Sequence, residues 1–298
     1  MTKPLVSICC LAYNHEPYIR ECLDGFLMQQ TNFDYEVIIH DDASTDETKA
    51  IIEEYTQNYL DVFFPMYQTE NQYSKGVRGI MAKFNFPRCR GKYIALCEGD
   101  DYWTDPLKLQ KQVDFLEANI HFPAVSHNSK VIGLEERNFN AGASQVFLTD
   151  DLLNFRLFHT NTLLFRNTSE ILLDLSYVRN ILSGDRMLFL IISKYGGIAY
   201  SDEIMSVYRK NNGGLSKNVT YKHLKKDLKM LMILDRIDLV YNKRKAFKFI
   251  HYTLFNYSTK KLTWFEKIDY LAIKIKFDLK NKQLNVADYK RLISLIIR

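Results

Sequence analysis

Up to Ala118, short apolar runs alternate with stretches in which apolar residues recur at helical spacing. Val6–Ala12 is a continuous apolar run of the kind found in strands that are buried on both faces of a parallel sheet. Similar runs predict strands at residues 35–40, 62–67 and 92–97. Strands that alternate with helices in this way predict an α/β fold, in which right-handed crossovers build an open sheet.

The expected helices lie between these strands and after the last of them. Asn14 is the predicted N-cap of a helix at residues 18–30, because Asn side chains satisfy backbone N–H groups at helix starts. Ser44 and Glu47 have the spacing of a capping box and predict a helix that continues to residue 59. The remaining helices are expected at residues 75–84 and 106–118.

Beyond Phe122 the pattern is less regular, and from Tyr221 it is almost wholly helical, with apolar residues three and four positions apart. We therefore expect an α/β domain over residues 1–216 and a helical region over residues 217–298. Within the first part, further strands are expected at residues 124–131, 145–148, 161–165 and 205–209, and a helix at residues 185–195.

Composition excludes several classes of protein. With only 12 Gly and 6 Pro in 298 residues, the chain is not collagenous, linker-dominated or disordered. Its apolar run Met187–Ile192 is far shorter than the roughly 20 residues that a membrane-spanning helix needs. Leu5–Tyr13 is followed by Asn14, His15 and Glu16 instead of a small-residue cleavage site, which favours a buried strand over a signal peptide. Five Cys without metal-ligand spacing fit a reducing cytosol, so we expect a cytoplasmic protein.

Charge is distributed unevenly along the chain. Residues 217–298 contain 20 Lys and Arg against 7 Asp and Glu, a net charge of +13, whereas the preceding part has a net charge of −8. Ile268, Leu271, Ile275 and Leu279 form one face of an amphipathic helix rich in lysine, which can lie on the anionic inner face of a cell membrane. Alternatively, the apolar faces pack on the preceding domain or on a second subunit, as in a homodimer, and these interpretations are compatible. Nucleic-acid binding is disfavoured, because no recognised module accompanies the charge.

Acidic residues stand where ligands bind in an open parallel sheet, beyond the carboxyl ends of the strands. They are Asp41 and Asp42, then Asp100 and Asp101, and later Asp185 at a helix start. The pair at 100–101 follows an apolar strand, and its oxygens suit a hard divalent cation. The earlier pair is explained equally well as turn and cap residues, and Asp185 has the alternative of a helix N-cap. No Gly-x-Gly-x-x-Gly motif follows the first strand, which argues against a dinucleotide-binding dehydrogenase.

Short motifs in a fixed order carry a resemblance to a known family. They are Val6-Ser7 with Tyr13-Asn14, Glu36–Asp42 continuing into Ala43-Ser44-Thr45-Asp46, Gly91-Lys92-Tyr93-Ile94, and Glu98-Gly99-Asp100-Asp101. Together they resemble the family 2 glycosyltransferases with the GT-A fold, over roughly residues 4–216. The resemblance implies a Rossmann-like open mixed sheet flanked by helices, with residues 217–298 as a C-terminal helical appendage. It also implies an inverting enzyme that uses a nucleotide-diphosphate sugar together with Mg²⁺ or Mn²⁺.

The resemblance assigns expected roles to residues near the strand ends. In the family, the second acid of the strand-two pair reads the nucleotide base, which implies Asp42 beside a uracil-type ring with the backbone of Leu11 and Tyr13 nearby. Asp101 would be a direct metal ligand, and Asp100 would contact the ribose or the metal and its water shell. The chain departs from a strict Asp-x-Asp motif, since Gly99 stands where the first acid would be.

Two basic loops are candidates for nucleotide binding. Asn71 and Arg78 precede the third expected helix and are candidate nucleotide contacts, with solvated surface residues as the alternative. Arg209 begins a basic, glycine-containing stretch to Ser216 that is similar to the family's loop over the donor phosphates. The alternative for this stretch is a flexible linker between the two parts of the chain, and both interpretations can hold.

The implied general base is Asp185, in the step Ser183-Gly184-Asp185-Arg186. Inverting transfer needs one carboxylate near the acceptor hydroxyl, opposite the leaving diphosphate, so that attack and departure are in line. Trp103 directly follows the acidic motif, which suggests stacking on a sugar in the acceptor site, and packing in the core explains it equally well. His127 and His159 are interpreted as structural, because lone histidines are more often hydrogen-bonded core residues than catalysts.

The resulting hypothesis is an inverting, metal-dependent glycosyltransferase. It would move a sugar from a nucleotide-diphosphate donor, expected to be UDP-linked, to a hydroxyl of a glycan or lipid-linked acceptor in cell-envelope polysaccharide assembly. The rival hypothesis is a non-catalytic nucleotide-sugar-binding or scaffolding protein that has the same fold.

Overall fold

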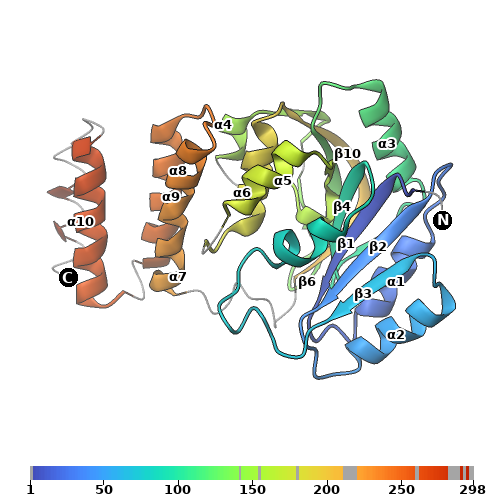
Figure 1. Ribbon diagram of the computed structural model, residues 1–298. Coiled ribbons are helices and arrows are strands. Elements are labelled where there is room, and N and C mark those ends of the chain that lie inside the picture. Colours follow the sequence, from blue (N-terminus) through green and yellow to red (C-terminus); the bar gives the residue numbers. More distant parts are fainter. Residues whose placement is uncertain are drawn as a thin grey trace.

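The structure is a computed structural model, and it describes residues 3–140, 142–153, 156–178, 181–210, 220–258, 262–280, 289–290 and 293–294 (Figure 1). A ten-stranded mixed sheet has the order β3-β2-β1-β4-β9-β6-β10-β5, with β7 paired to β6 and β8 paired to β10. Its strands are β1 (Val6–Ala12), β2 (Tyr35–Asp41), β3 (Phe63–Tyr67), β4 (Tyr93–Glu98), β5 (Tyr102–Trp103), β6 (Ala124–Gly133), β7 (Arg137–Asn138), β8 (Gln145–Phe147), β9 (Leu164–Arg166) and β10 (Ile198–Lys210).

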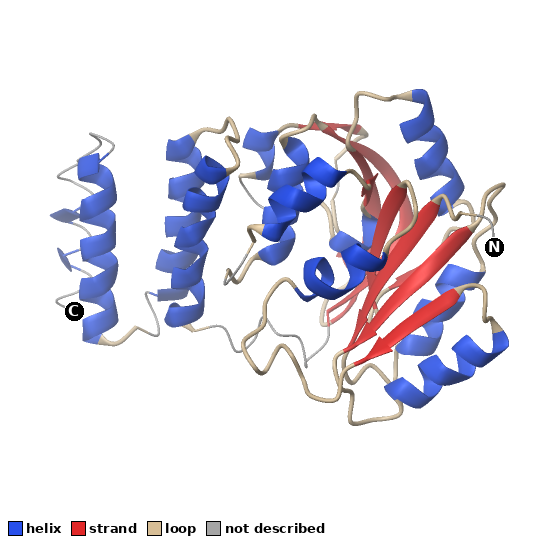
Figure 2. Ribbon diagram, in the orientation of Figure 1, coloured by secondary structure: helices blue, strands red, loops and turns tan. Residues whose placement is uncertain are grey.

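Helices cover both faces of this sheet (Figure 2). One hydrophobic cluster joins the sheet to α1, α2 and α3, and a second joins it to α4, α5, α6 and the C-terminal helices. The helices are α1 (Ile19–Leu27), α2 (Thr48–Asn58), η1 (Met81–Asn85), η2 (Phe86–Arg88), α3 (Lys108–Ala118), α4 (Thr149–Leu152), η3 (Thr160–Thr162), α5 (Ser169–Ser176), α6 (Gly184–Ser193), α7 (Tyr221–Lys225), η5 (Lys226–Leu228), α8 (Lys229–Arg236), α9 (Lys243–Ser258) and α10 (Trp264–Lys280). The predicted α/β fold with a helical C-terminal region is confirmed.

The register of the parallel strands brings the acidic motifs to one edge of the sheet. In β1, Ala12 pairs with Asp41 of β2, and Leu11 pairs with Glu98 of β4. Since all three strands are parallel, their carboxyl ends lie side by side, with the end of β1 in the middle. The residues that follow β2 and β4 therefore face the same edge.

Most predicted strands are confirmed, and the differences lie at their ends. The expected strand at residues 161–165 is a 3₁₀ turn followed by β9, which begins at Leu164. β10 begins at Ile198, before the predicted residue 205, because its pairing with β6 continues through shifts in register between Ser201 and Ser206. Such irregularities interrupt the alternation of inward and outward residues from which a strand is predicted.

The prediction of a helix at residues 75–84 is wrong. Gly76 and Gly79 have φ values of +89° and +65°, in the left-handed region that interrupts a right-handed helix. The chain forms a loop up to residue 80, and only the π-helical turn η1 and the 3₁₀ turn η2 follow.

The two predicted helix caps are also wrong. α1 begins at Ile19, and Asn14 instead accepts a 2.8 Å hydrogen bond from the backbone N–H of Thr45. Ser44 accepts a 2.9 Å hydrogen bond from the backbone N–H of Asn14, and α2 begins at Thr48 without a capping box. Both side chains thus join the loop after β1 to the loop after β2, a use that local spacing does not reveal.

The C-terminal helices pack on the domain that precedes them. α6 is buried on all sides from Met187 to Ile192, so it needs apolar cover on the side away from the sheet as well. Buried residues of the C-terminal helices share its hydrophobic cluster, among them Met230, Leu234, Ala246 and Tyr270. The predicted packing of the C-terminal helices on the preceding domain therefore holds for their inner faces. The domain boundary at residue 216 remains a prediction. In the described part of the chain, no helix is long and apolar enough to cross a membrane.

Candidate active site

The turn after β4 lies at the centre of the candidate site. A β-carbon at Gly99 would lie 2.9 Å from Nδ1 of His15 and 2.9 Å from Cδ1 of Ile19. It would also lie 3.2 Å from the carbonyl oxygen of Leu11, which accepts a 2.8 Å hydrogen bond from the backbone N–H of Gly99. A side chain at this position would require these neighbours to shift, which disfavours a first aspartate in the acidic motif.

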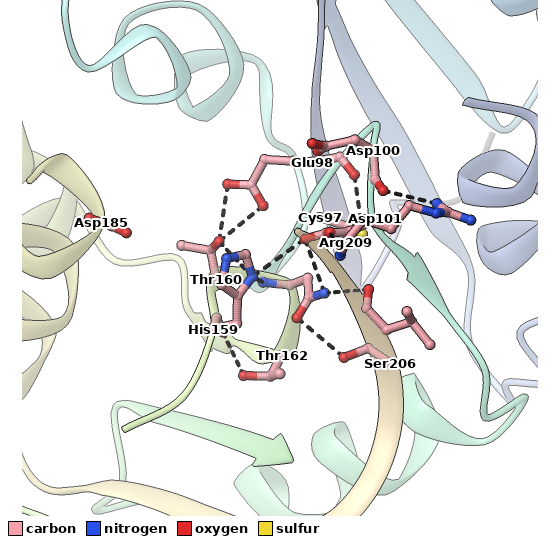
Figure 3. Close-up of polar contacts among 12 residues, drawn as sticks. Cys97, Glu98, Asp100, Asp101, His159, Thr160, Thr162, Asp185, Ser206 and Arg209 are labelled. Atoms are coloured by element: carbon pink, nitrogen blue, oxygen red, sulfur yellow. Dashed lines mark hydrogen bonds and ion pairs between the residues drawn. The ribbon is translucent and has the colours of Figure 1, made fainter. Parts of the chain in front are cut away.

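Glu98, Asp101 and His159 come together at this turn (Figure 3). One potential ligand atom from each of them lies within 4.8 Å of the others, and Nδ1 of His159 is 3.4 Å from Oδ2 of Asp101. Asp101 is buried, with 1% of its surface exposed. The three side chains belong to segments about 60 residues apart that the antiparallel pairing of β9 with β4 brings together.

Neighbouring groups hold the two carboxylates in place. Oδ1 of Asp101 accepts a 2.8 Å hydrogen bond from the backbone N–H of Arg209, and its Oδ2 accepts one of 3.1 Å from Asn161. Asn161 in turn donates a 2.9 Å hydrogen bond to the carbonyl of Val207. The hydroxyl of Thr160 contacts both carboxylate oxygens of Glu98, at 3.1 and 3.0 Å. β10 and η3 thus fix the orientation of the acidic group.

The electrostatics of this group favour a bound cation. Burial, followed by the negative charges of Asp100 and Glu98, holds the pKa of Asp101 well above its usual range. Burial and Asp100 raise the pKa of Glu98 to about 7. Burial lowers the pKa of His159 to about 3, so its imidazole is neutral at physiological pH. A neutral imidazole beside two carboxylates is a ligand set that suits a divalent cation such as Mn²⁺, which would offset the cost of ionising both acids.

The His159 ring is held by aromatic neighbours. The ring of Tyr208 stacks on it at 3.8 Å between centroids, and Phe139 meets it edge-on at 5.8 Å. Nδ1 of His159 accepts a 3.5 Å hydrogen bond from the backbone N–H of Asn161 when the ring proton is on Nε2. The same unprotonated nitrogen then faces a carboxylate oxygen of Asp101. Two acceptors at such a distance need a proton or a cation between them. The residues present therefore fit a metal ion.

Asp42 organises the loop that contains two of the predicted nucleotide contacts. Its carboxylate accepts hydrogen bonds from the backbone N–H groups of Gln72, at 2.8 Å, and Tyr73, at 3.0 Å. Asn71 donates a 3.1 Å hydrogen bond to the carbonyl of Asp42. The guanidinium of Arg78 lies 3.8 Å from the centre of the Tyr73 ring and donates to the Tyr73 carbonyl at 2.8 Å. The structure thus places Asp42, Asn71 and Arg78 together.

His15 lies between the acidic pair after β2 and the one after β4. Burial lowers its pKa, while Asp100, Asp46 and Asp41 act in the opposite direction. Leu11 and Tyr13 stand at the end of β1 beside it, and Tyr13 is exposed. The predicted nucleotide-binding and metal-binding residues therefore share one edge of the sheet.

Asp185 approaches this group from a different element, the first turn of α6. Its carboxylate forms an ion pair with Arg156 and accepts a 2.8 Å hydrogen bond from the backbone N–H of Arg186. Burial alone would raise the pKa of Asp185, but Arg156 and this hydrogen bond lower it overall. Figure 3 shows Asp185 apart from the hydrogen-bonded group around Asp101. Its charge contributes to the raised pKa of Glu98, after burial and Asp100.

Comparison with known proteins decides the family. The model of glycosyl transferase family 2 matches residues 7–168, more than half of the chain, including the Asp42 and Asp101 motifs. The chain belongs to glycosyltransferase family 2. The predicted family is therefore confirmed.

Relatives of this chain occur in several bacteria. Rv1520 of Mycobacterium tuberculosis and Mb1547 of Mycobacterium bovis are each 40% identical to it over 219 residues, which is 70% of this chain and 60% of theirs. The chain thus spans about 60% of the length of these relatives. TuaG of Bacillus subtilis, whose name assigns it to teichuronic acid biosynthesis, is 27% identical over 218 residues, which is 72% of this chain and 83% of TuaG.

Solved structures share the fold of this chain. Residues 1–349 of S. aureus TarS in complex with UDP-GlcNAc align with a TM-score of 0.64 at 17% identity, over 84% of this chain and 71% of that one. The mannosyltransferase PcManGT from Pyrobaculum calidifontis, in complex with GDP-Man and Mn²⁺, aligns with a TM-score of 0.57 at 15% identity, over 100% of this chain and 86% of that one. The predicted GT-A fold is confirmed.

Two further predicted site residues, Arg209 and Trp103, have partners within the chain. Arg209 donates from its side chain to the carbonyl of Asp100, at 2.9 Å, and forms an ion pair with Glu21. It lies at the end of β10 beside Asp101, while residues 211–216 of the predicted loop lie outside the described residues.

The suggestion that Trp103 stacks on an acceptor sugar needs correction. Its side chain is 1% exposed, its indole N–H donates a 2.9 Å hydrogen bond to the carbonyl of Asn161, and its ring meets Phe26 edge-on at 4.9 Å. The packing alternative therefore holds, because an indole enclosed by β5, α1 and η3 presents no face to a ligand.

Some residues of the candidate site were missed from the sequence. His159 was interpreted as structural, and the structure places it in the acidic group instead. Thr160 and Asn161, which bind Glu98 and Asp101, and Arg156, which pairs with Asp185, were not singled out. The polar run His159-Thr160-Asn161-Thr162 precedes an apolar strand instead of following one, and it reaches the acidic group only because β9 is antiparallel to β4.

Proposed function

We propose that the chain is an inverting, metal-dependent glycosyltransferase that moves a sugar from a nucleotide-diphosphate donor, UDP-linked, to a hydroxyl group of a glycan or lipid-linked acceptor. The observation that carries this proposal is the buried group Glu98, Asp101 and His159 at the carboxyl end of β4. Its excess negative charge is suited to a divalent cation and, through that cation, to a diphosphate.

Each part of the site has a proposed task. Asp101, with Glu98 and His159, would hold Mg²⁺ or Mn²⁺, which when bound neutralises the charge that develops on the leaving diphosphate. Asp100 would contact the ribose or the water shell of the ion. Asp42 would read the base from the loop that it holds in place, with Asn71, Arg78 and the backbone at Leu11 and Tyr13 as further nucleotide contacts. Arg209 would face the donor phosphates from the end of β10.

Asp185 is the proposed general base. Arg156 keeps its carboxylate ionised in the resting protein. The same ion pair makes Asp185 a weak base, because a lowered pKa disfavours proton uptake. We propose that the acceptor draws Arg156 away from Asp185, so that the carboxylate can accept the proton of the attacking hydroxyl. Positioning and charge neutralisation then account for most of the protein's contribution.

The donor and the setting are proposed from the relatives. The TarS structure contains UDP-GlcNAc and the PcManGT structure contains GDP-Man with Mn²⁺, which supports a nucleotide-diphosphate sugar and a divalent cation. The name of TuaG supports a role in the assembly of cell-envelope polysaccharides. We propose that the chain works in the cytoplasm, at the inner face of the cell membrane.

The rival function is a non-catalytic nucleotide-sugar-binding protein of the same fold. Asp185→Asn separates the two, since it should leave donor binding intact and lower the release of UDP from a UDP-sugar about 100-fold or more. Glu170→Gln, an exposed acid in the first turn of α5, is the matched control and should keep wild-type turnover. Donor binding with no UDP release by the wild type would favour the rival, and full turnover by Asp185→Asn would remove Asp185 as the base.

A further inference from the structure

α10 presents two different faces. Its inner face contains Tyr270 and Asp278, both buried, and the partly buried Leu271, which packs against the core. Its outer face contains Phe265, Ile268, Ala272, Ile275 and Leu279, which we call the outer stripe, and every one of them is exposed. Their spacing of three and four residues places them along one line of the helix. Figure 1 shows α10 at the end of the molecule opposite β3, next to the C-terminus.

The outer stripe is strongly apolar for a surface. Phe265 is 78% exposed, and Trp264 beside it is 59% exposed. Exposed side chains of this size are usual when they stand singly, whereas a continuous row of them on one helix face marks a surface that binds something. Aromatic residues at one end of such a row are typical of helices that lie in the interface of a lipid bilayer.

The acidic side chains of α10 are engaged away from the outer stripe. Asp269 accepts hydrogen bonds from Tyr221, at 3.0 Å, and Lys225, at 2.6 Å, both on α7. Asp278 is buried and bonds to Tyr289 at 2.5 Å. Glu266 accepts from Thr263 at the start of its own helix. Lys276 is exposed as well, on the side of the helix that also carries Asp269, seven residues earlier. The outer stripe itself is wholly apolar and contains no acidic side chain.

The charge of the C-terminal region indicates what the outer stripe binds. Residues 217–298 have a net charge of +13, so two copies that met through this face would bring like charges together. An anionic lipid surface attracts the positive charge of this region and also accepts the apolar side chains of the outer stripe. We propose that the outer stripe of α10 docks the protein on an anionic membrane surface. This proposal does not depend on the proposed reaction.

The two tryptophans provide a direct measurement. Trp103 is 1% exposed and Trp264 is 59% exposed, and they are the only Trp in the chain. When the full chain is mixed with phosphatidylglycerol–phosphatidylcholine vesicles, we expect the emission of Trp264 to shift to shorter wavelength and the protein to sediment with the vesicles. Pure phosphatidylcholine vesicles should bind it about tenfold more weakly or worse, because the electrostatic contribution is lost.

Variants test whether the outer stripe is the surface involved. The pair Phe265→Glu and Ile275→Glu should lower binding to the anionic vesicles about tenfold or more, since two apolar contacts are replaced by negative charge. Val240→Glu, at a residue that is 90% exposed between α8 and α9, is the matched control and should bind like the wild type. Circular dichroism and thermal melting of each variant show whether the fold is kept.

Contrary results are equally specific. Absence of binding to anionic vesicles at low salt, or undiminished binding by the folded double variant, would overturn the proposal. A dimer of the wild type in light scattering that the double variant dissociates, without any vesicle binding, would assign the outer stripe to a second copy of this chain instead.

Discussion

Ser183 donates a 2.6 Å hydrogen bond from its hydroxyl to Oδ2 of Asp227, and this bond joins the start of α6 to the C-terminal helices. The backbone N–H groups of Leu182 and Ser183 donate to the other oxygen of Asp227, at 2.8 and 3.0 Å. Asp227 is buried, so these bonds are shielded from water. The helix that carries Asp185 is thus held by a side chain from the region after residue 216, which makes that region part of the scaffold of the site.

Removal of this link should cost both stability and activity. Asp227→Ala leaves two backbone N–H groups and a hydroxyl without their acceptor, which should lower the free energy of unfolding by about 2–3 kcal/mol. Asp227→Asn keeps an acceptor oxygen and should cost less than about 1 kcal/mol. Urea denaturation measures both, with Asp61→Ala at an exposed position as the control. UDP release by Asp227→Ala should fall while UDP binding is kept. Equal stability of the wild type and Asp227→Ala would show that the link is unimportant.

Glu98 should make stability depend on pH when no divalent cation is present. Its pKa is raised from 4.5 to about 7 by burial and by Asp100, so between these values the folded protein holds a proton that the unfolded chain has released. The free energy of unfolding should therefore fall as pH rises from 4.5 to 7, by on the order of 2 kcal/mol. His159, with its pKa lowered to about 3, has the opposite effect below pH 6.5. The quantity to measure is thus the difference between the wild type and Glu98→Gln.

Saturating Mn²⁺ should remove the contribution of Glu98 to the pH dependence of stability. The reason is that a cation binds the ionised carboxylate and compensates for its burial. The expected result is a wild-type stability that no longer falls toward pH 7 relative to Glu98→Gln. A difference between the two proteins that is flat in pH without metal would show that Glu98 is ionised throughout this range.

Lys108 should produce a second pH dependence, in a different pH range from that of Glu98. Its ammonium nitrogen is buried, 2.7 Å from Oε1 of Gln112 and 3.9 Å from the centre of the Trp103 ring. Burial lowers its pKa to about 7, so between pH 7 and 10.5 the unfolded chain binds a proton that the folded protein does not. Stability should therefore rise with pH across this window, and Lys108→Met should flatten the rise.

The measurement for Lys108 is urea denaturation at several pH values between 7 and 10. Lys130→Met, at an exposed position on β6, is the control and should keep the wild-type slope. A slope that Lys108→Met leaves unchanged would mean that another group titrates in this window.

Apolar runs were sufficient to predict the parallel half of the sheet. A strand such as Val6–Ala12 is buried on both faces, so its composition alone distinguishes it from a surface segment. The acidic motifs could also be placed at one edge of the sheet, because right-handed crossovers make the strands parallel and bring their carboxyl ends together. The helix caps could not be predicted, because Asn14 and Ser44 satisfy partners in another loop about 30 residues away.

The acidic group could be predicted only in part. Asp101 stands in a recognisable motif, whereas His159 reaches it through the pairing of β9 with β4, and no local pattern encodes that approach. The burial of Trp103 likewise results from contacts with Phe26 and Asn161, which are far away in the sequence. When the neighbours of a residue come from distant segments of the chain, its spacing in the sequence is a weak guide to its role.

The central claim is that Glu98, Asp101 and His159 hold a divalent cation that binds the diphosphate of the donor. Calorimetric titration of the full chain with UDP, with and without Mn²⁺, tests it most directly. We predict that Mn²⁺ strengthens UDP binding about tenfold or more in the wild type and that Asp101→Asn, in a protein that keeps its thermal stability, removes this gain. Equal UDP affinity with and without Mn²⁺, or a gain that persists in Asp101→Asn, would contradict the claim.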